Sequence, residues 1–322
     1  MKKTLMSLGL AVATLSACSP HIHLDFLGQE KMAEVVLLPS PAKDKVLMID
    51  VEGVITATVA TGLFSREKNA VSRVYERLER AAEDPLVKAV ILRLDTPGGE
   101  VTASDIIFHE VLRFRERTRK PVIALMMGIA ASGGYYIASA CDLIMAHPTT
   151  LTGSIGVISI FPNVEDLMSK IGVKVNVIKS GEEKDSGGPF RDMTAEEKKI
   201  FQAVIDEYYQ DFLNAVTAGR KGKIAPEELR RIADGRIYTA PQALRLKLVD
   251  EIGYFGDAFR RARDAAGLKE ARLVSYTYYP LSQTNIYASR LGEFSTPDEK
   301  ALESALSLLK TGFYYLWLPQ GR

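Results

Sequence analysis

The sequence predicts an α/β protein in which parallel strands alternate with helices. Short, nearly continuous apolar runs alternate with amphipathic segments of helical length, a pattern typical of a parallel sheet covered on both faces. Glycine-rich turns directly follow two of these runs. The chain has 322 residues and is 47% hydrophobic, which is enough to bury one large core or two smaller ones.

Six apolar runs are expected to form the strands of this sheet. They are short and rich in valine, isoleucine and leucine, and they cover 46–51, 87–94, 122–127, 143–145, 156–160 and 173–178. Runs of this length without regular polar alternation indicate strands that are buried on both faces.

Helices fill the intervals between these strands. Apolar residues recur with helical spacing over 70–82 and 102–117. Thr194 and Glu197 match a capping box, which predicts a long helix that ends at about residue 218. Pro226 is expected in the first turn of a further helix, where its missing N–H is not needed. One α/β domain over 45–267 accounts for the whole alternation.

Residues 1–17 have the layout of a secretory signal, because Lys2 and Lys3 precede a short apolar run. The run ends in Leu15-Ser16-Ala17-Cys18, which resembles the lipobox of bacterial lipoproteins. In that motif the cysteine is lipidated and becomes the new N-terminus. We therefore expect Cys18 to anchor the mature chain to a membrane through lipid. An ordinary signal peptide that contains a cysteine by chance is the alternative.

Two segments flank the expected domain. Residues 18–44 contain prolines and no sustained periodicity, which predicts a tether between the lipid and the folded body. Residues 268–322 form a C-terminal extension that is rich in aromatic side chains, among them Tyr276, Tyr315 and Trp317. So much apolar surface is unusual for a solvated terminus, and we expect this extension in a subunit contact or packed under the body.

Composition excludes several classes of function. Lys and Arg number 41 against 40 Asp and Glu, without a long basic tract, so nothing favours nucleic acid as a partner. Two cysteines and four scattered histidines offer no spacing for a structural metal site, and no metal or other cofactor is predicted. Cys141 lies in an apolar segment and is expected to be a buried free thiol.

Ser132 is the first candidate for chemistry. It follows the expected strand over 122–127 and precedes Gly133 and Gly134, at the start of a short helix. The helix dipole and free amides there would favour a developing negative charge. The glycine two residues before a nucleophile-elbow serine is absent, which disfavours an α/β-hydrolase. Taken alone, an ordinary helix N-cap serine is the simpler interpretation.

A second glycine turn, Asp95 to Gly99, ends another expected strand. Ligands of open α/β sheets bind at this carboxyl edge. Backbone amides of Gly98 or Gly99 together with that of Gly133 are therefore candidates for an oxyanion hole. Pro-Gly-Gly is also common in plain turns, and that alternative stays open.

No histidine is well placed to act as the base for a serine nucleophile. His21 and His23 fall in the tether, His109 in a helix and His147 in a turn before Pro148. A lysine that is neutral at working pH is the other established base, but composition does not choose among the many lysines.

Five sequence blocks resemble those of the SppA signal peptide peptidases, in the same order along the chain. They are Ile49-Asp50-Val51-Glu52-Gly53, Thr96-Pro97-Gly98-Gly99, Ala131-Ser132-Gly133-Gly134-Tyr135-Tyr136, Thr152-Gly153-Ser154-Ile155-Gly156-Val157 and the segment 179–191. The resemblance implies a fold of the Clp protease and crotonase type, with repeated ββα and βαβ units and parallel sheets, followed by C-terminal helices and the aromatic tail.

The resemblance also implies roles for individual residues. Ser132 corresponds to the nucleophile, Lys184 to the general base and Ser154 to the serine that orients this lysine. From spacing alone Lys184 would be a solvated loop lysine, and Lys179 is its closest rival. A later block, 234–239, resembles a structural part of the family's domain.

The expected function is that of a membrane-anchored serine endopeptidase with a Ser/Lys dyad. It would degrade cleaved signal peptides or other unstructured hydrophobic peptides in the bacterial cell envelope, facing the periplasm or the exterior. The resemblance implies a ring-shaped homo-oligomer in which Ser132 and Lys184 can come from neighbouring protomers. Ser19 after the cysteine is compatible with the outer membrane, so the choice of membrane stays open. A crotonase-like acyl-transfer enzyme and a catalytically silent scaffold lipoprotein are the alternatives.

Overall fold

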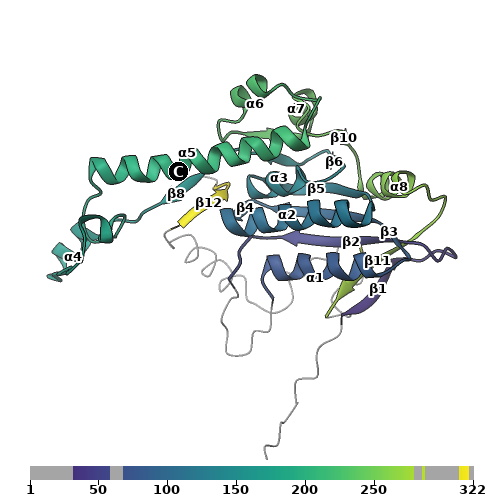
Figure 1. Ribbon diagram of the computed structural model, residues 1–322, viewed down its shortest axis with the longest axis horizontal. Coiled ribbons are helices and arrows are strands. Elements are labelled where there is room, and N and C mark those ends of the chain that lie inside the picture. Colours follow the sequence, from purple (N-terminus) through teal and green to yellow (C-terminus); the bar gives the residue numbers. More distant parts are fainter. Residues whose placement is uncertain (1–31, 59–67, 279–284, 287–311, 319–322) are drawn as a thin grey trace, which may run out of the picture.

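The computed structural model describes residues 32–58, 68–278, 285–286 and 312–318 (Figure 1). The expected signal segment, Cys18 and most of the expected tether lie outside these residues. Within the described ranges we find no helix whose length and apolar character would let it cross a bilayer.

A mixed, largely parallel sheet forms the centre of the molecule (Figure 1). Its strands in spatial order are β1 (Ala33–Leu38), β11 (Arg272–Thr277), β2 (Lys45–Glu52), β3 (Val87–Thr96), β5 (Val122–Ala131), β6 (Leu143–Ala146) and β10 (Glu251–Ile252). Strand β7 (Leu151–Gly153) continues beside the end of β5 and pairs with β9 (Ile237–Thr239). Only β1 with β11 and β7 with β9 are antiparallel among these described pairs. The predicted α/β class is confirmed.

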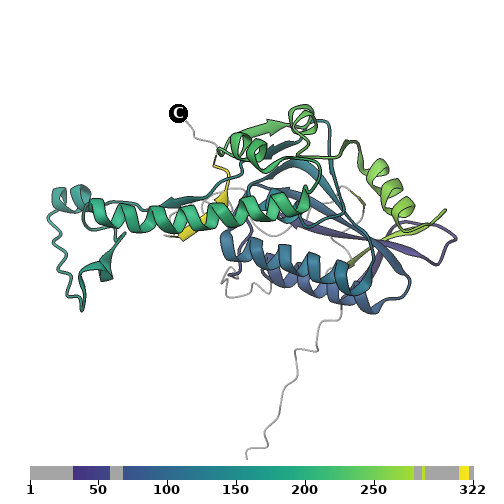
Figure 2. The ribbon, with the colours of Figure 1, turned by 45° about the horizontal axis from the view of Figure 1, so that its top comes forward.

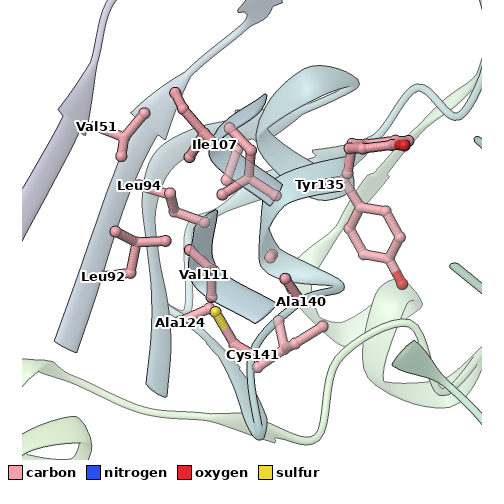
Figure 3. Close-up of a cluster of buried hydrophobic side chains, with 14 of the residues drawn as sticks. Val51, Leu92, Leu94, Ile107, Val111, Ala124, Tyr135, Ala140 and Cys141 are labelled. Atoms are coloured by element: carbon pink, nitrogen blue, oxygen red, sulfur yellow. The ribbon is translucent and has the colours of Figure 1, made fainter. Parts of the chain in front are cut away.

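Helices cover both faces of the sheet, because alternate residues of each strand point to opposite sides. On one face, Leu47 and Ile49 share a core with α1 (Ala70–Glu83), α2 (Val101–Thr118) and α3 (Gly133–Ala138). On the other face, Val46 and Met48 pack with α8 (Phe255–Ala265). Figure 3 shows part of the first core, where strand residues face Ile107 and Val111 of α2.

Cys141 lies in this first core (Figure 3) and is a free thiol, as predicted. Its side chain is buried, and burial raises its pKa to about 12. The thiol is therefore protonated at neutral pH, and Cys141 contributes to packing and not to chemistry.

An arm extends from the body (Figures 1 and 2). It contains β8 (Ile158–Ile160), α4 (Glu165–Lys170), a short 3-10 helix (Glu182–Asp185) and the first turns of α5 (Ala195–Gly219). The predicted strand over 173–178 is wrong, because this part of the arm forms no regular structure. Its apolar side chains face solvent, and Ile178 is 99% exposed. No strand of the described residues pairs with this apolar run, and strand formation depends on such pairing.

The long helix α5 begins with the predicted capping box. Thr194 Oγ1 accepts from the Glu197 amide at 3.1 Å, and a Glu197 carboxylate oxygen accepts from the Thr194 amide at 2.7 Å. The later turns of α5 pack Phe212 and Val216 into the core. Helices α6 (Pro226–Ile232), with proline in its first turn as predicted, and α7 (Ala240–Arg245) follow beside β9.

The segments that flank 45–267 take part in the fold. Strand β1 comes from the expected tether, and β11 lies between β1 and β2 although it follows them by most of the chain. Strand β12 (Gly312–Leu316) forms a second, three-stranded sheet with β4 (Gly98–Glu100) and β8. The aromatic segment therefore packs within the body of its own chain, one of the two places expected for it.

Candidate active site

Ser132 lies at the junction of β5 and α3, in a backbone conformation that is rare for a serine. Its φ is 52° and its ψ is −114°. A non-glycine residue in this region costs about 1–3 kcal/mol and persists only where the surroundings enforce it. Here the Ser132 amide donates to the Gly153 carbonyl at 2.8 Å, and its carbonyl accepts from the Tyr136 amide at 2.8 Å. The strained turn is therefore held from both sides.

Small residues allow this turn to form. A Cβ on Gly134 would lie 2.7 Å from Cγ2 of Thr96, so a larger residue there would push α3 away from β3. Ala130 and Ala131, the last residues of β5, are fully buried. The strand-to-helix turn thus resembles a nucleophile elbow in shape, although the glycine two residues before the serine is an alanine.

The Ser132 side chain does not cap the helix. Ser132 is 1% exposed, its hydroxyl makes no capping bond, and the hydroxyl has no hydrogen-bond partner among the described residues. The interpretation as an ordinary N-cap serine is therefore wrong. A buried hydroxyl without a partner is costly, and each such group in a native protein calls for an explanation.

Gly98 and Gly133 lie next to each other, as the oxyanion-hole hypothesis requires. A Cβ on Gly98 would lie 2.7 Å from the Gly133 nitrogen, and the φ of Gly98 is +100°. Gly133 supplies the first amide of α3, which has no partner within its own helix. The Gly98 amide, however, donates to Thr96 Oγ1 at 3.0 Å. Gly99 packs against the backbone of Ile55 and pairs with Tyr315 in β12.

Ser154 directly follows Gly153, whose carbonyl accepts the hydrogen bond from the Ser132 amide. Ala131 pairs with Gly153 where β5 meets β7, so Ser132 and Ser154 follow paired positions. Ser154 also has a positive φ, 48°, and is 7% exposed. Its amide donates to the Arg236 carbonyl at 2.8 Å. The 234–239 block therefore supports the backbone at Ser154, which agrees with its expected structural role.

Lys184 lies on the arm, in the short 3-10 helix, and is exposed. The arm leads away from α3, where Ser132 lies (Figures 1 and 2). One chain therefore does not bring Lys184 to Ser132. Lys179, the rival base, donates to the carboxylate of Asp185 at 2.7 Å. Arg191 and Lys179 together hold the pKa of Asp185 below its usual range.

Other groups at the site are poorly suited to act as the base. Burial raises the pKa of Tyr135 and of Tyr136 well above 10, so both phenols are protonated at neutral pH. Their hydroxyls donate to the Leu248 carbonyl and to Asp105. His147 stays in its turn and contacts Thr149 and Tyr254. Within the described ranges no cluster of metal-ligating side chains is present.

Two residues near Ser132 were not assigned to the site from sequence. Tyr315 of β12 is 1% exposed, its ring stacks 5.0 Å from that of Tyr136, and its hydroxyl donates to the Tyr208 carbonyl. The many aromatic side chains of the C-terminal extension indicated that it is buried, but not which elements it contacts. Ser104 of α2 is fully buried beside Gly133. A serine inside an amphipathic helix carries no signal of that position.

Comparisons with known proteins give a consistent result. The model of Peptidase family S49 matches residues 115–269. A protein of Enterococcus faecium that carries the name signal peptide peptidase SppA is 35% identical over 251 residues, which are 78% of this chain and 72% of that protein. Protease 4 of Haemophilus influenzae is 34% identical over 70% of this chain and 36% of its own. The chloroplastic serine protease SPPA of Arabidopsis thaliana is 33% identical over 65% of this chain and 32% of its own.

Proposed function

This chain belongs to peptidase family S49 and is a serine peptidase, and from this premise we propose that Ser132 is its nucleophile and Lys184 of a neighbouring subunit its general base. Membership of a peptidase family disfavours the two alternatives, an acyl-transfer enzyme and a silent scaffold.

The conformation of Ser132 carries the proposal. Backbone strain and an unpartnered buried hydroxyl occur together at this one residue. Both are unfavourable for folding, and both fit a nucleophile that must be aimed and left without competing hydrogen bonds. The neighbouring Gly133 amide supports the same role, because an oxyanion formed at Ser132 would lie close to it.

The position of Lys184 supports a shared site. A base must come within hydrogen-bond reach of the nucleophile, and the arm carries Lys184 away from Ser132 of the same chain. The arm also exposes apolar side chains, including Leu167, Ile171 and Ile178. A second copy that covers this arm would bury them and would bring its own Ser132 towards Lys184, with Ser154 as the group that orients the amine.

The reaction then follows the usual course of acyl transfer. The neutral Lys184 amine accepts the Ser132 proton as Oγ attacks the scissile carbonyl carbon, and the carbonyl π pair moves onto oxygen. The C–N bond breaks as the tetrahedral intermediate collapses, and the lysine returns its proton to the leaving amine. Water then attacks the ester by the same path, which releases the acid and restores Ser132.

The substrates we propose are unstructured hydrophobic peptides, cleaved signal peptides among them, since one relative is named a signal peptide peptidase. We also propose that Cys18 carries a lipid and holds the mature protein at the bacterial cell envelope. The lipobox-like sequence Leu15-Ser16-Ala17-Cys18 supports this anchor.

Subunit mixing tests the shared site. Ser132→Ala and Lys184→Arg should each abolish hydrolysis of a labelled unfolded protein such as casein, since a guanidinium stays protonated and does not act as a base. When the two inactive proteins are dissociated, mixed and reassembled, hybrid assemblies should recover part of the activity. Each hybrid interface that joins an intact Ser132 to an intact Lys184 forms a working centre.

Lys174→Arg is the matched control, because Lys174 is an exposed lysine of the same arm. It should retain wild-type activity. Near wild-type turnover by Lys184→Arg would show that Lys184 is not the base and would direct attention to Lys179. A mixture that stays inactive, although mass spectrometry shows hybrid assemblies, would contradict a site shared between subunits.

A further inference from the structure

The short helix that carries Lys184 gives this side chain little support of its own. It is a 3-10 helix of four residues, and the Lys184 side chain is exposed. The Lys184 amine forms no ion pair with a described residue, although Glu182 and Glu183 directly precede it. A general base has to be held within hydrogen-bond reach of its target, and a misplacement of about 1 Å can cost 100-fold in rate. The position of Lys184 therefore depends on how its backbone is fixed.

Asp185, the residue after Lys184, is held by the side chain of Arg191. Nε and Nη2 of Arg191 donate to the two carboxylate oxygens of Asp185 at 3.1 Å and 2.8 Å. Two parallel hydrogen bonds between a guanidinium and a carboxylate fix the orientation of both groups as well as their distance. Lys179 donates to the same carboxylate at 2.7 Å, and the Asp185 side chain is only 17% exposed.

The same guanidinium also binds the start of α5. Nη1 of Arg191 donates to one carboxylate oxygen of Glu197 at 3.0 Å, and Nη2 donates to the other. The Glu197 side chain is 1% exposed and belongs to the capping box of α5. This helix has 25 residues, and its later turns pack into the core of the body. Arg191 therefore bridges the helix of Lys184 and a long element that is anchored in the body.

The loop between Asp185 and Arg191 is packed closely enough to keep this bridge in place. Gly187 has a φ of +69°, and a Cβ there would lie 2.6 Å from Phe161 and 3.1 Å from Phe201. The rings of Phe161 and Phe201 are themselves 4.4 Å apart, and Phe201 belongs to α5. The loop thus rests on an aromatic pair of the arm, and only glycine fits at its closest point.

We propose that Arg191 is a positioning residue for the general base: its guanidinium bridges Asp185 and Glu197 and thereby fixes the backbone of Lys184 relative to α5. The inference rests on the proposed role of Lys184. Arg191 transfers no proton and contacts no reacting atom. It acts through Asp185, and it sets where the Lys184 amine lies when a neighbouring Ser132 approaches.

Arg191→Met removes the bridge and keeps an apolar side chain at this position. Loss of the positioning should lower kcat by about 100-fold with little change in KM. Arg191→Lys keeps the positive charge but not the paired hydrogen bonds, so its kcat should be intermediate.

Asp185→Asn disturbs the same bridge at its other end. If Arg191 acts through Asp185, the two changes should not add: the kcat of the double variant with Arg191→Met should equal that of the slower single variant.

Subunit mixing supplies a readout that a general loss of stability would not produce. In a shared site, Ser132 and Lys184 of one chain serve two different centres. Arg191→Met mixed with Ser132→Ala should therefore regain activity, since some interfaces join an intact Ser132 to an intact arm. Arg191→Met mixed with Lys184→Arg should stay at its own residual rate, because both chains are defective in the arm. Native mass spectrometry should show hybrid assemblies in both mixtures.

Arg261→Met is the matched control. Arg261 of α8 also donates to both oxygens of one carboxylate, that of Glu251, at 2.9 Å and 2.5 Å. Helix α8 covers the face of the sheet opposite to α3. This variant loses an ion pair of the same geometry and should keep the wild-type kcat.

The outcomes distinguish the inference from the function on which it rests. A kcat for Arg191→Met within about twofold of wild type, with Lys184→Arg inactive, overturns the role of Arg191 and leaves the base unaffected. Additive losses in the double variant, or a loss of kcat that accompanies dissociation into monomers, also overturn it. So does regained activity in hybrids of Arg191→Met with Lys184→Arg. An active Lys184→Arg overturns the proposed function itself.

Discussion

Ser132 adopts backbone angles that glycine tolerates better than serine does, and the chain nonetheless has serine at this position. The Gly153 carbonyl and the Tyr136 amide fix the turn, and Gly134 gives α3 room beside Thr96. The strain at this residue is therefore supported by ordinary hydrogen bonds and packing in the residues around it.

Ser132→Gly should stabilise the protein and abolish its activity. Glycine adopts positive φ without the steric cost, so we expect a gain of roughly 1 kcal/mol in the free energy of unfolding, measured by urea titration. Lys247→Gly is the control, because Lys247 also has a positive φ, 59°, and is an exposed residue in the turn after α7. It should gain stability in the same way and remain active. A destabilised Ser132→Gly would show that the turn is not strained.

At the scale of elements, patterns in the sequence were enough to predict the strands that are central in the sheet. The expected runs over 46–51, 87–94 and 122–127 became β2, β3 and β5, since each is apolar on both faces. The β5 strand continues to Ala131, so its last residues set the position of Ser132 directly. The capping box of α5 could be predicted from the sequence because each of its two side chains accepts a hydrogen bond from the backbone amide of the other residue, only three positions away.

Strands that form only by pairing with segments far away in the sequence could not be predicted from local patterns. Strand β1 is half exposed and gains its place only by pairing with β11, and β12 pairs with β4 and β8. The run over 173–178 has the composition of a strand but no partner within the described residues. Local composition does not reveal which segment lies alongside another, and strand formation depends on that pairing.

The start of α5 should lose stability in acid. Hydrogen bonds from Arg191 and from the Thr194 amide lower the pKa of Glu197 to about 2 from an ordinary 4.5. A carboxylate with a lowered folded-state pKa contributes its full stabilisation above about pH 4.5 and loses it as the pH falls towards 2. Glu197→Gln should therefore lower the urea midpoint at pH 7, and the difference from wild type should shrink at pH 3.

Glu196→Gln is the matched control for this prediction. Glu196 lies in the same first turn of α5, but its side chain is 66% exposed and pairs with the exposed Lys199. Its midpoint should follow that of the wild type at both pH values. An equal difference between Glu197→Gln and wild type at pH 7 and pH 3 would contradict the role of the carboxylate charge.

At the scale of the whole molecule, the spacing of the candidate site residues did not indicate that Ser132 and Lys184 lie apart in one chain; only the resemblance to the SppA peptidases implied that they can come from neighbouring protomers. Because parallel strands end at one edge of the sheet, four of the candidate residues come together there, namely Gly98, Ser132, Gly133 and Ser154. Lys184 does not join them, since the arm that carries it leaves the body (Figure 2). Spacing along the chain does not distinguish a base that folds back from one that reaches a neighbour.

Ile178→Glu should disrupt the assembly and, with it, the activity. Ile178 is 99% exposed on the arm, and a charge there would oppose burial against a second copy. We expect sedimentation velocity to show a shift towards monomer, with an unchanged circular dichroism spectrum. Leu244→Glu, at an apolar residue of α7 that is 38% exposed, is the control and should remain assembled and active. An active, monomeric Ile178→Glu would contradict the shared site.

The position of β11 between β1 and β2 also has a consequence during biosynthesis. When the ribosome has made the first two strands, the segment that must enter between them has not yet been translated. The same holds for the pairing of β4 with β12. Contacts between such distant segments form late, so the wall beside Gly98 and Gly99 is completed only after translation has passed residue 316. A nascent chain that has not yet reached residue 316 therefore lacks the strand that pairs with Gly98 and Gly99.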